Sequence, residues 1–359
     1  MERFGLVGLP NAGKSSLYNA LTGGGALAAP YAFATKDPNV GVSRVLDTRL
    51  DRLAAMSKSR NVVHATVQLV DIGGLVEGAS RGEGLGNKFL GGIRDVDAIV
   101  LVLRAFEDDD VPGITDPLEH LRVLELELAL ADLETVEGQL TRKQKVARMD
   151  RSVADEVASL EAAFSALSAG TPLYRAGLDG KQREAIKSYF LLTNKPVLVV
   201  VNVGEHRLDT ISQQVARVQG ELQVDDVEVL GLCVQLEAEA AQLDEMDRIE
   251  LLEVLGLGEG ALPRLVHAAY QLLGLRTFFT TGEKESRAWT FRAGSKAPEC
   301  AGRIHSDMQR GFIRAEVIHW DELLEIGSWH KARDVGKLRV EGKDYEVVDG
   351  DVLEIRFNV

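Results

Sequence analysis

Short continuous apolar runs, separated by helical stretches, dominate the pattern of hydrophobic and polar positions along this chain. Residues 3–7 form the first run, and residues 67–72, 98–103, 197–201 and 229–234 form the others. A strand that is buried on both faces of a parallel sheet is apolar at consecutive positions rather than at alternate ones. The runs therefore predict the central strands of a doubly wound α/β sheet.

A long helical insertion interrupts this pattern between the strands that end near residue 103 and begin near residue 197. Its apolar positions recur at heptad spacing in two segments, which predicts two antiparallel helices packed as a coiled-coil arm. Because each seam spans only about two heptads, a plain helical hairpin is the alternative. A polar, basic connection is expected at residues 141–148. In the first helix the expected seam residues are Leu126, Leu130, Leu133 and Leu140, and Glu137 occupies the one seam position without an apolar residue. In the second helix they are Val153, Val157, Leu160, Phe164 and Leu167.

The pattern changes again after a helix expected at residues 262–273. From about residue 277 onward, apolar and polar positions alternate as in strands, and turn pairs such as Asp349-Gly350 occur. Residues 276–359 carry 14 Lys and Arg against 15 Asp and Glu, a net charge of −1, so the remainder of the −14 total is −13. This difference supports a separate C-terminal domain.

Composition narrows the class of protein. The chain has 359 residues, more than one compact core usually holds, so two or three domains are expected. No apolar run is long enough to span a membrane, and the N-terminus leads directly into a strand, so neither a membrane partner nor a signal peptide is expected. The two cysteines, Cys233 and Cys300, favour a reducing, cytoplasmic environment over a disulfide framework. With a net charge of −14, RNA binding would need a local basic patch.

A phosphate-binding loop follows the first strand. Residues 8–15, Gly-Leu-Pro-Asn-Ala-Gly-Lys-Ser, fit G-x-x-x-x-G-K-[ST], and a helix is expected from about Lys14 to Thr22. A strand, this loop and a helix in that order indicate a nucleoside triphosphate site. Lys14 would reach the β- and γ-phosphates, and the Ser15 hydroxyl would bind Mg²⁺. The expected nucleotide contacts of the loop are Asn11, Ala12, Gly13, Lys14, Ser15 and Ser16.

Two further segments complete the expected phosphate and magnesium site. Thr35 lies in a loop where a threonine that closes on Mg²⁺ and the γ-phosphate belongs, although an ordinary surface threonine fits there too. Residues 71–74 fit D-x-x-G, so Asp71 would hold Mg²⁺ through water and the Gly74 N–H would contact the γ-phosphate. A turn or cap role is the alternative for Asp71. The expected metal ligands are Ser15, Thr35 and Asp71, and the expected catalytic groups are Lys14, Thr35 and Gly74.

The sequence does not show which group orients the attacking water. Ras-like enzymes place a glutamine after D-x-x-G, but this chain has Leu75, whose apolar side chain cannot position water. Another group must do so, or turnover is slow. Asn11 is a candidate ligand for a monovalent cation such as K⁺ beside the phosphates, and a loop-shaping asparagine is an equal alternative.

The segment that would recognise the base departs from the guanine pattern. Where a GTPase carries Asn-Lys-x-Asp, residues 202–205 read Asn-Val-Gly-Glu. The carboxylate of Glu205 is displaced by one carbon, and unpaired groups in a buried bidentate contact cost about 1–3 kcal/mol each. The altered motif therefore disfavours guanine without spelling out an adenine code. The expected base contacts are Asn202, Val203, Glu205 and Cys233, although Cys233 fits ordinary strand-end packing equally well.

These features together resemble the YchF subfamily of Obg-related P-loop NTPases, the Obg-like ATPases, over essentially the whole chain. The residues that carry the resemblance are 8–15, 71–80, 82–87, 128–133, 287–291, 311–316 and 341–345. The resemblance implies a nucleotide domain, an inserted coiled-coil arm and a C-terminal TGS domain of β-grasp type. It further implies ATP preference over GTP, slow hydrolysis, ribosome or RNA binding, and a role in translation or stress control.

The chain departs from this subfamily at two positions. Members of the bacterial type carry a histidine in the loop after the fourth strand, whereas residues 106–114 here are shortened and contain none. His120 follows in a helix and is not assumed to replace it. Gly204 stands where many members have a polar residue, so one possible base contact is lost.

Basic residues gather at the predicted arm tip and in the C-terminal piece. Phosphate contacts need such charges, and RNA binding through them would weaken with salt. For each residue taken alone, a solvated surface charge is the commoner explanation. The expected RNA-binding residues are Arg142, Lys143, Lys145, Arg148, Lys296, Arg303, Arg310 and Arg314, with Lys331 and Arg333 as further candidates.

The expected organisation is a P-loop domain at residues 1–120 and 191–275, an inserted helical arm at residues 121–190, and a TGS domain at residues 276–359. The main hypothesis is a slow, Mg²⁺-dependent, monomeric ATPase that switches ribosome or RNA binding. One alternative is a GTPase switch that tolerates Glu205 in place of aspartate. The other is a non-catalytic module in which ATP only sets the domain geometry.

Overall fold

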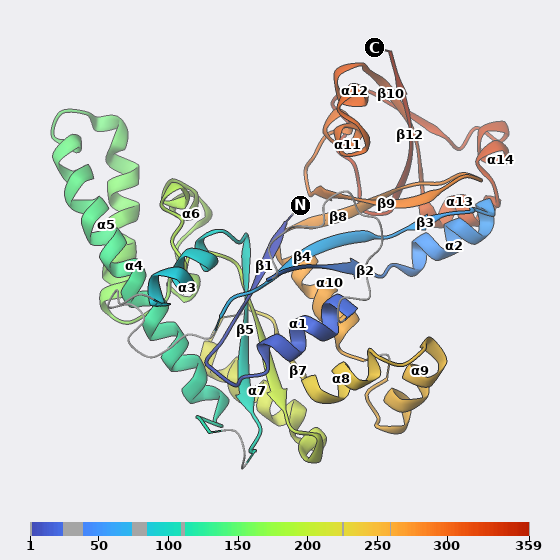
Figure 1. The fold of residues 1–359 in the computed structure, drawn as a ribbon. Helices are drawn as coiled ribbons and strands as arrows, with labels where there is room; N and C mark the ends of the chain where they lie inside the picture. Colours follow the sequence, from blue (N-terminus) through green and yellow to red (C-terminus); the bar gives the residue numbers. More distant parts are fainter. Residues whose placement is uncertain are drawn as a thin grey trace. The chain divides into compact units, whose positions relative to one another are not determined.

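The structure is a computed structural model that divides into two compact units. The first unit comprises Met1–Ser43 and Gln68–Ala269, and the second comprises Arg44–Val67 and Tyr270–Val359 (Figure 1). The described residues are 2–23, 39–73, 85–108, 112–224, 226–258 and 260–358, without the side chains of 85–88 and 245.

A six-stranded sheet with the order β2-β4-β1-β5-β6-β7 forms the centre of the first unit. The central pairs β4-β1, β1-β5, β5-β6 and β6-β7 are all parallel, and every residue of β5 and β6 is buried. The expected apolar strands and the doubly wound sheet are therefore confirmed. The strands are β1 (Arg3–Val7), β2 (Val40–Val45), β4 (Ala65–Asp71), β5 (Ala98–Ala105), β6 (Val197–Val203) and β7 (Val229–Leu232).

Because the central strands are parallel, their carboxyl ends lie at the same edge of the sheet, and ligands of such sheets bind at that edge. Helices follow the strands along the chain. The helices are α1 (Lys14–Thr22), α3 (Leu85–Arg94), α7 (Ile211–Leu222), α8 (Val234–Ala240), α9 (Glu245–Val254) and α10 (Leu262–Leu272). Short 3₁₀ turns lie at Arg151–Val153, Leu173–Arg175, Lys187–Tyr189 and Glu205–Thr210.

Two long helices form the insertion between β5 and β6: α4 (Pro117–Ala147) and α5 (Ala154–Ser168), followed by the short α6 (Gly180–Ala185) (Figure 1). Asp116 caps α4 by accepting the Leu118 N–H, and Pro117 suits the first helical turn. The two helices share a buried cluster in which Ala129 and Val136 of α4 meet Leu160 of α5.

The expected seam of α4 is partly wrong. Leu126 and Leu130 are 51% and 41% exposed, whereas Leu133 and Leu140 do pack against the cluster of α5. The buried positions follow the heptad spacing through Ala129 and Val136 instead, because small and β-branched residues fill that face. Leucines alone were therefore a poor guide to the register.

The connection between the two helices is also shorter than the sequence predicted. α4 continues through Ala147, and the chain reverses at residues 148–153. Lysine, glutamine, arginine and alanine favour helix, and basic residues near a helix C-terminus interact well with its dipole. Arg142, Lys143 and Lys145 therefore lie on the last turns of a helix rather than in a loop.

The second unit has its own six-stranded sheet, with the order β11-β10-β12-β8-β9-β3. Its strands are β3 (Val62–Val63), β8 (Leu275–Thr280), β9 (Ser286–Arg292), β10 (Phe312–His319), β11 (Arg339–Glu341) and β12 (Asp351–Phe357). Its helices are α2 (Thr48–Ser57), α11 (Ala297–Ile304), α12 (Ser306–Arg310), α13 (Trp320–Ile326) and α14 (Trp329–Asp334).

The second unit includes a segment that the sequence did not assign to it. Residues 44–67, expected in the nucleotide domain, supply α2 and the edge strand β3. Arg49 pairs with Asp349 at 2.7 Å and lies over the Phe279 ring, and Ser59 donates to the Gly282 carbonyl at 2.7 Å. The expected boundary at residue 276 therefore captures only the larger part of this unit.

Within the described residues, no helix has both the length and the apolar character that a membrane crossing needs.

Candidate functional site

The loop between β1 and α1 closely approaches its neighbours at two glycines. A Cβ at Gly8 would lie 2.6 Å from the Val102 carbonyl oxygen, and one at Gly13 would lie 2.4 Å from Nδ2 of Asn202. Gly13 also has a φ of 93°, which side chains rarely adopt. The motif glycines are thus required by packing and by backbone conformation, and the loop leads into the N-terminus of α1, where anions bind well.

Lys14 is held inside this loop. Its side chain is buried, and Nζ donates to the Leu9 carbonyl at 2.8 Å. Burial lowers the pKa of Lys14 to about 8, and the charge of Asp71 opposes part of that shift. Among the described residues Lys14 forms no ion pair, so a phosphate group would supply the anionic partner and stabilise the charged form of the side chain further.

Ser15 and Asp71 come from α1 and from the end of β4. The Ser15 hydroxyl donates to Oδ2 of Asp71 at 2.8 Å. The other carboxylate oxygen, Oδ1, is buried and has no hydrogen-bond partner among the residues that the structure describes. Mg²⁺ is usually held by one or two protein oxygens together with phosphates and waters. The pair fits Mg²⁺, and no cluster of three metal-binding side chains occurs in the same described residues.

Asn202 connects the phosphate-binding loop to residues 202–205, the segment that is expected to recognise the base. Its Nδ2 donates to the Ala12 carbonyl at 3.1 Å, and its Oδ1 accepts the Val234 N–H at 3.0 Å. The amide is almost fully buried and joins β6, the loop and the start of α8. Within the described contacts, Asn202 thus acts on the nucleotide site by positioning the loop.

The remaining base-side residues differ in exposure. Val203 and Cys233 are each 1% exposed and pack in the core of the first unit, where burial raises the pKa of the Cys233 thiol. Glu205 is partly exposed, and one of its carboxylate oxygens lies 3.1 Å from Nε2 of His206. A Cβ at Gly204 would lie 3.2 Å from Cβ of Phe106, so a larger residue would press on the loop after β5.

Arg104 is a site residue that the sequence analysis missed. It is the next-to-last residue of β5, is 1% exposed, and donates to the carbonyls of Phe106 and Pro112 at 3.0 and 3.4 Å. Asn11 of the phosphate loop donates to the same Pro112 carbonyl at 3.3 Å. The loop after β5 is therefore tied to the phosphate loop. A charged residue at the end of an otherwise apolar run was the available signal.

His120 is buried beside this loop and does not face the phosphate site with a free nitrogen. Its Nδ1 accepts the Arg104 N–H at 3.4 Å, which leaves Nε2 to donate to the Ile114 carbonyl at 2.9 Å. Burial lowers its pKa to about 4, and the nearby Arg104 adds to the shift against the opposing Ile114 bond. His120 is therefore neutral and structural.

The other expected site residues are placed as follows. Asn11, Ser15 and Ser16 are exposed, with Asn11 at a φ of 61°, whereas Ala12 is buried. Thr35, Gly74 and Leu75 lie outside the described residues.

Three of the eight expected RNA-binding residues are engaged in ion pairs. Lys143 lies 2.7 Å from Glu156, Lys296 lies 3.0 Å from Asp344, and Arg310 pairs with Asp307. Among the described residues, no ion pair involves Arg142, Lys145, Arg148, Arg303 or Arg314. The first three belong to the first unit and the last two to the second, so they are two separate groups.

Comparison with known proteins covers the entire chain. A family model described as a 50S ribosome-binding GTPase matches residues 3–203, and a YchF-GTPase_C model, described as a protein of unknown function, matches residues 275–358. The chain is 46% identical over 361 residues to a Bacillus subtilis protein named ribosome-binding ATPase YchF, covering 99% of each. It is 43% identical over 365 residues to the Escherichia coli O157:H7 protein of that name, again covering 99% of each.

Solved structures give the same match. The Schizosaccharomyces pombe YchF GTPase superposes with a TM-score of 0.88 at 32% identity, covering 99% of this chain and 97% of that one. A Pyrococcus horikoshii GTP-binding protein superposes with a TM-score of 0.62 at 18% identity over 100% of both chains, which shows a shared fold alone.

Proposed function

This chain belongs to the YchF family of Obg-related P-loop NTPases, and on that premise we propose that it is a slow, Mg²⁺-dependent ATPase that acts as a nucleotide switch on ribosomes. One observation carries the proposal. Lys14, Ser15 and Asp71 converge on the carboxyl edge of the sheet. Among the described residues, the buried Lys14 ammonium bonds only the Leu9 carbonyl and forms no ion pair, and the buried Asp71 Oδ1 has no hydrogen-bond partner. A triphosphate with its magnesium ion supplies both partners.

The residues of the site have separate roles in this proposal. The Lys14 ammonium binds the β- and γ-phosphates and neutralises charge as the γ-phosphoryl group leaves. Ser15 Oγ and Asp71 Oδ1 would hold Mg²⁺, which when bound offsets charge on the phosphate oxygens. Thr35 and the Gly74 N–H stay proposed as γ-phosphate contacts from their motifs, and Asn11 as a ligand for K⁺.

The proposal of slow turnover rests on the lack of a recognisable residue that would orient the attacking water. Leu75 replaces the water-orienting glutamine, and residues 106–114 contain no histidine. His120 uses both ring nitrogens on backbone partners. Charge stabilisation without a positioned water accounts for weak hydrolysis, because general-base help typically adds 10²–10⁴-fold to a rate.

ATP preference over GTP rests on the base-side residues. Glu205 begins the 3₁₀ turn after β6 and has a stem one carbon longer than aspartate, and Val203 is buried where GTPases place a lysine. Both changes weaken guanine recognition. The retained carboxylate favours a GTP-using switch as the second candidate.

Phosphate release tests the catalytic proposal directly. Lys14→Ala should abolish release above background, and Asp71→Asn should weaken both hydrolysis and its Mg²⁺ dependence. Lys195→Ala serves as the control, because Lys195 donates to the Arg94 and Val96 carbonyls away from the loop. Full hydrolysis by Lys14→Ala would refute the proposal. If the wild-type chain itself released no phosphate but still bound ATP, it would be a non-catalytic, ATP-gated module.

Calorimetric titration with non-hydrolysable ATP and GTP analogues at matched Mg²⁺ tests the base preference. A preference for ATP of tenfold or more, about 1.4 kcal/mol, is expected. Equal affinity, or tighter binding of the GTP analogue, would make the chain a GTPase switch.

Ribosome binding, translation or stress control, and cytoplasmic location are proposed from the family. We also propose that α4 and α5 act as a coiled-coil arm, that the second unit is a TGS domain of β-grasp type, and that the chain is a monomer.

The exposed Arg142, Lys145 and Arg148 support RNA contacts by the arm. Replacing all three by glutamine should weaken co-sedimentation with ribosomes and flatten its salt dependence. Unchanged co-sedimentation would exclude these three residues of the arm as ribosome contacts.

A further inference from the structure

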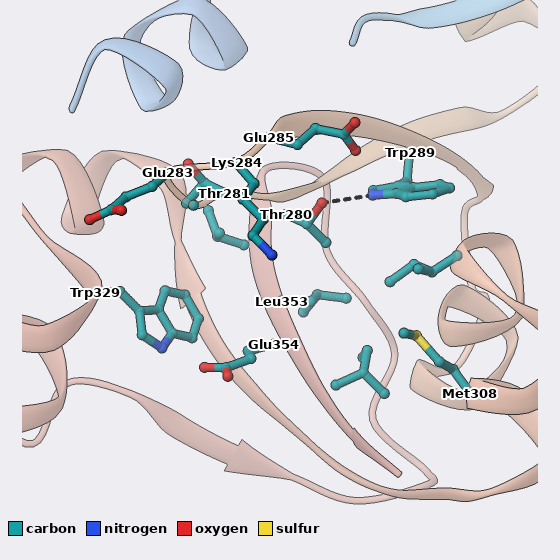
Figure 2. A pocket seen from close by; sticks show the side chains of 14 residues that line it. Thr280, Thr281, Glu283, Lys284, Glu285, Trp289, Met308, Trp329, Leu353 and Glu354 are labelled. Atoms are coloured by element: carbon teal, nitrogen blue, oxygen red, sulfur yellow. Dashed lines mark hydrogen bonds between the residues drawn. The ribbon is translucent and has the colours of Figure 1, made fainter. Parts of the chain in front are cut away.

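The second unit contains a pocket of about 750 Å³ whose lining comes from that unit alone (Figure 2). The volume falls within the range of about 300–1,000 Å³ that is usual for small-molecule sites. The lining is supplied by the end of β8, the turn before β9, β9 itself, the helices α11, α12 and α14, and the strand β12. None of these elements carries a residue of the proposed ATPase site.

One side of the pocket is apolar. Met308 and Ile304 come from the helices, and Leu353 from β12 forms the floor. Figure 2 shows Trp289 and Met308 on this side and Trp329 with Glu354 on the opposite side. Such a surface suits an apolar body several carbon atoms long, because burying each CH₂ group is favourable.

The charges of the lining are largely balanced by groups outside it. A carboxylate oxygen of Glu285 lies 3.0 Å from Nε of Arg287, and Glu354 pairs with Arg333 at 3.2 Å and with Arg356 at 3.0 Å. These glutamates therefore leave little net negative charge in the pocket.

Lys284 and Glu283 are the charged lining residues for which no ion pair occurs among the described residues. Figure 2 shows the Lys284 side chain extending toward Leu353 at the centre of the pocket, whereas the Glu283 carboxylate extends away from it. The uncompensated charge that faces the pocket is thus a single ammonium group.

Neither indole N–H group of the lining is available to a ligand in the pocket. Trp289 Nε1 donates to the Thr280 hydroxyl oxygen at 2.9 Å. Trp329 Nε1, by contrast, is buried and has no hydrogen-bond partner in the described part of the chain. Because Trp329 Nε1 is closed off from solvent, the Trp329 ring meets the pocket with its apolar atoms and adds to the apolar lining.

We propose that this pocket binds an apolar molecule that carries a carboxylate. The carboxylate accepts from the Lys284 ammonium, and the apolar body packs on Met308, Ile304 and Leu353. An ionised acceptor forms the stronger bond with an ammonium, so the charge of the ligand matters as much as its shape. The carboxylate can belong to a free small acid or to the end of a peptide.

The test follows the indole N–H resonances of the full-length chain by ¹H–¹⁵N NMR. The chain has three tryptophans, Trp289, Trp320 and Trp329, and Trp329→Phe assigns the third resonance by its loss. The probes are octanoate and N-acetyl-leucyl-leucine, each beside its neutral amide. A saturable shift of the Trp329 resonance is expected with a carboxylate and not with its amide, because the Trp329 ring lines the pocket.

A matched pair of lysine variants gives the second readout. Lys284→Met keeps the length of the stem and should weaken carboxylate binding at least tenfold. Lys343→Met removes an exposed charge of the same unit outside the pocket and should have no effect. Tighter binding of octanoate would identify a free acid, and tighter binding of the dipeptide a peptide terminus. Equal binding of the amides, unchanged affinity in Lys284→Met, or no shift at Trp329 would each overturn the proposal.

Discussion

At the scale of single residues, Lys14 shows how burial sets the chemistry of the nucleotide site. The sequence places a lysine in the loop, but only the structure shows its ammonium bonded to Leu9 with a lowered pKa. The same is true of Asn202, which the motif suggests as a base contact and which instead joins Ala12 to Val234. Motifs identify such residues, and their surroundings decide what they do.

The affinity for ATP should fall as the pH rises through about 8. The pKa of Lys14 is about 8 in the free protein, and bound phosphate raises it, so binding needs the protonated form. The dissociation constant of an ATP analogue should rise about tenfold between pH 7 and pH 9. The triphosphate is already ionised there and contributes little change. Calorimetry between pH 7 and pH 9 measures this change in the dissociation constant. Lys14→Met should bind the analogue weakly and with no dependence on pH. A flat wild-type profile would contradict the shift.

His120 should make the protein sensitive to acid. Its folded pKa is about 4 against 6.5 in the unfolded chain, so between these values only the unfolded state binds the proton. The free energy of unfolding should therefore fall by about 3 kcal/mol as the pH drops from 6.5 to 4. Urea unfolding at several pH values measures this. His120→Gln should lose that part of the slope, whereas His206→Gln, at an exposed position, should keep it. An equal slope in both variants would exclude His120 as the cause.

At the scale of elements, the packing of α4 depends on two different partners along its length. Leu124 and Leu128 belong to the core of the first unit, and Ala129 and Val136 belong to the cluster shared with α5. Buried Asp132 accepts the N–H groups of Leu192 and Thr193, and so fixes the helix to the segment that leads into β6. Because the buried face changes its partner, leucine spacing alone assigned part of the α4 seam, Leu126 and Leu130, incorrectly.

A pair of identical substitutions tests the register of these helices. Leu160 is fully buried in the shared cluster, so Leu160→Ala should lower the free energy of unfolding by about 2–5 kcal/mol. Leu126 is 51% exposed, so Leu126→Ala should change it by less than about 0.5 kcal/mol. Chemical denaturation provides both values. A comparable loss of unfolding free energy in the two variants would mean that Leu126 is buried in the seam, as the sequence predicted.

At the scale of the whole molecule, each unit is built from segments that are distant in the chain. Residues 44–67 leave the nucleotide unit, supply α2 and β3 to the second unit, and return to the first sheet through β4. The Arg49–Asp349 and Ser59–Gly282 contacts close loops of more than two hundred residues. Stability of the second unit thus depends on a part of the sequence that lies beside the phosphate-binding motifs.

Removing Arg49 should therefore destabilise the second unit selectively. Its side chain is 22% exposed and pairs with Asp47 at 2.8 Å and Asp349 at 2.7 Å. Arg49→Met should cost about 2 kcal/mol, less than a fully buried pair. Hydrogen exchange should show lost protection in β8 and β12 but not in β5. Arg60→Met, at an exposed position of the same segment, is the control. Loss of protection confined to the first unit would contradict this account.

The sequence by itself located the central strands along the chain, the phosphate loop, and the positions of Lys14, Ser15 and Asp71. Continuous apolar runs and short motifs are local patterns, and both describe contacts within a few residues of chain. The tertiary structure alone decided the register of α4, the role of Asn202, the place of residues 44–67, and the balance of charges around Lys284. Each of these depends on which distant groups meet a side chain, because burial and ion pairing are properties of the neighbours and not of the residue.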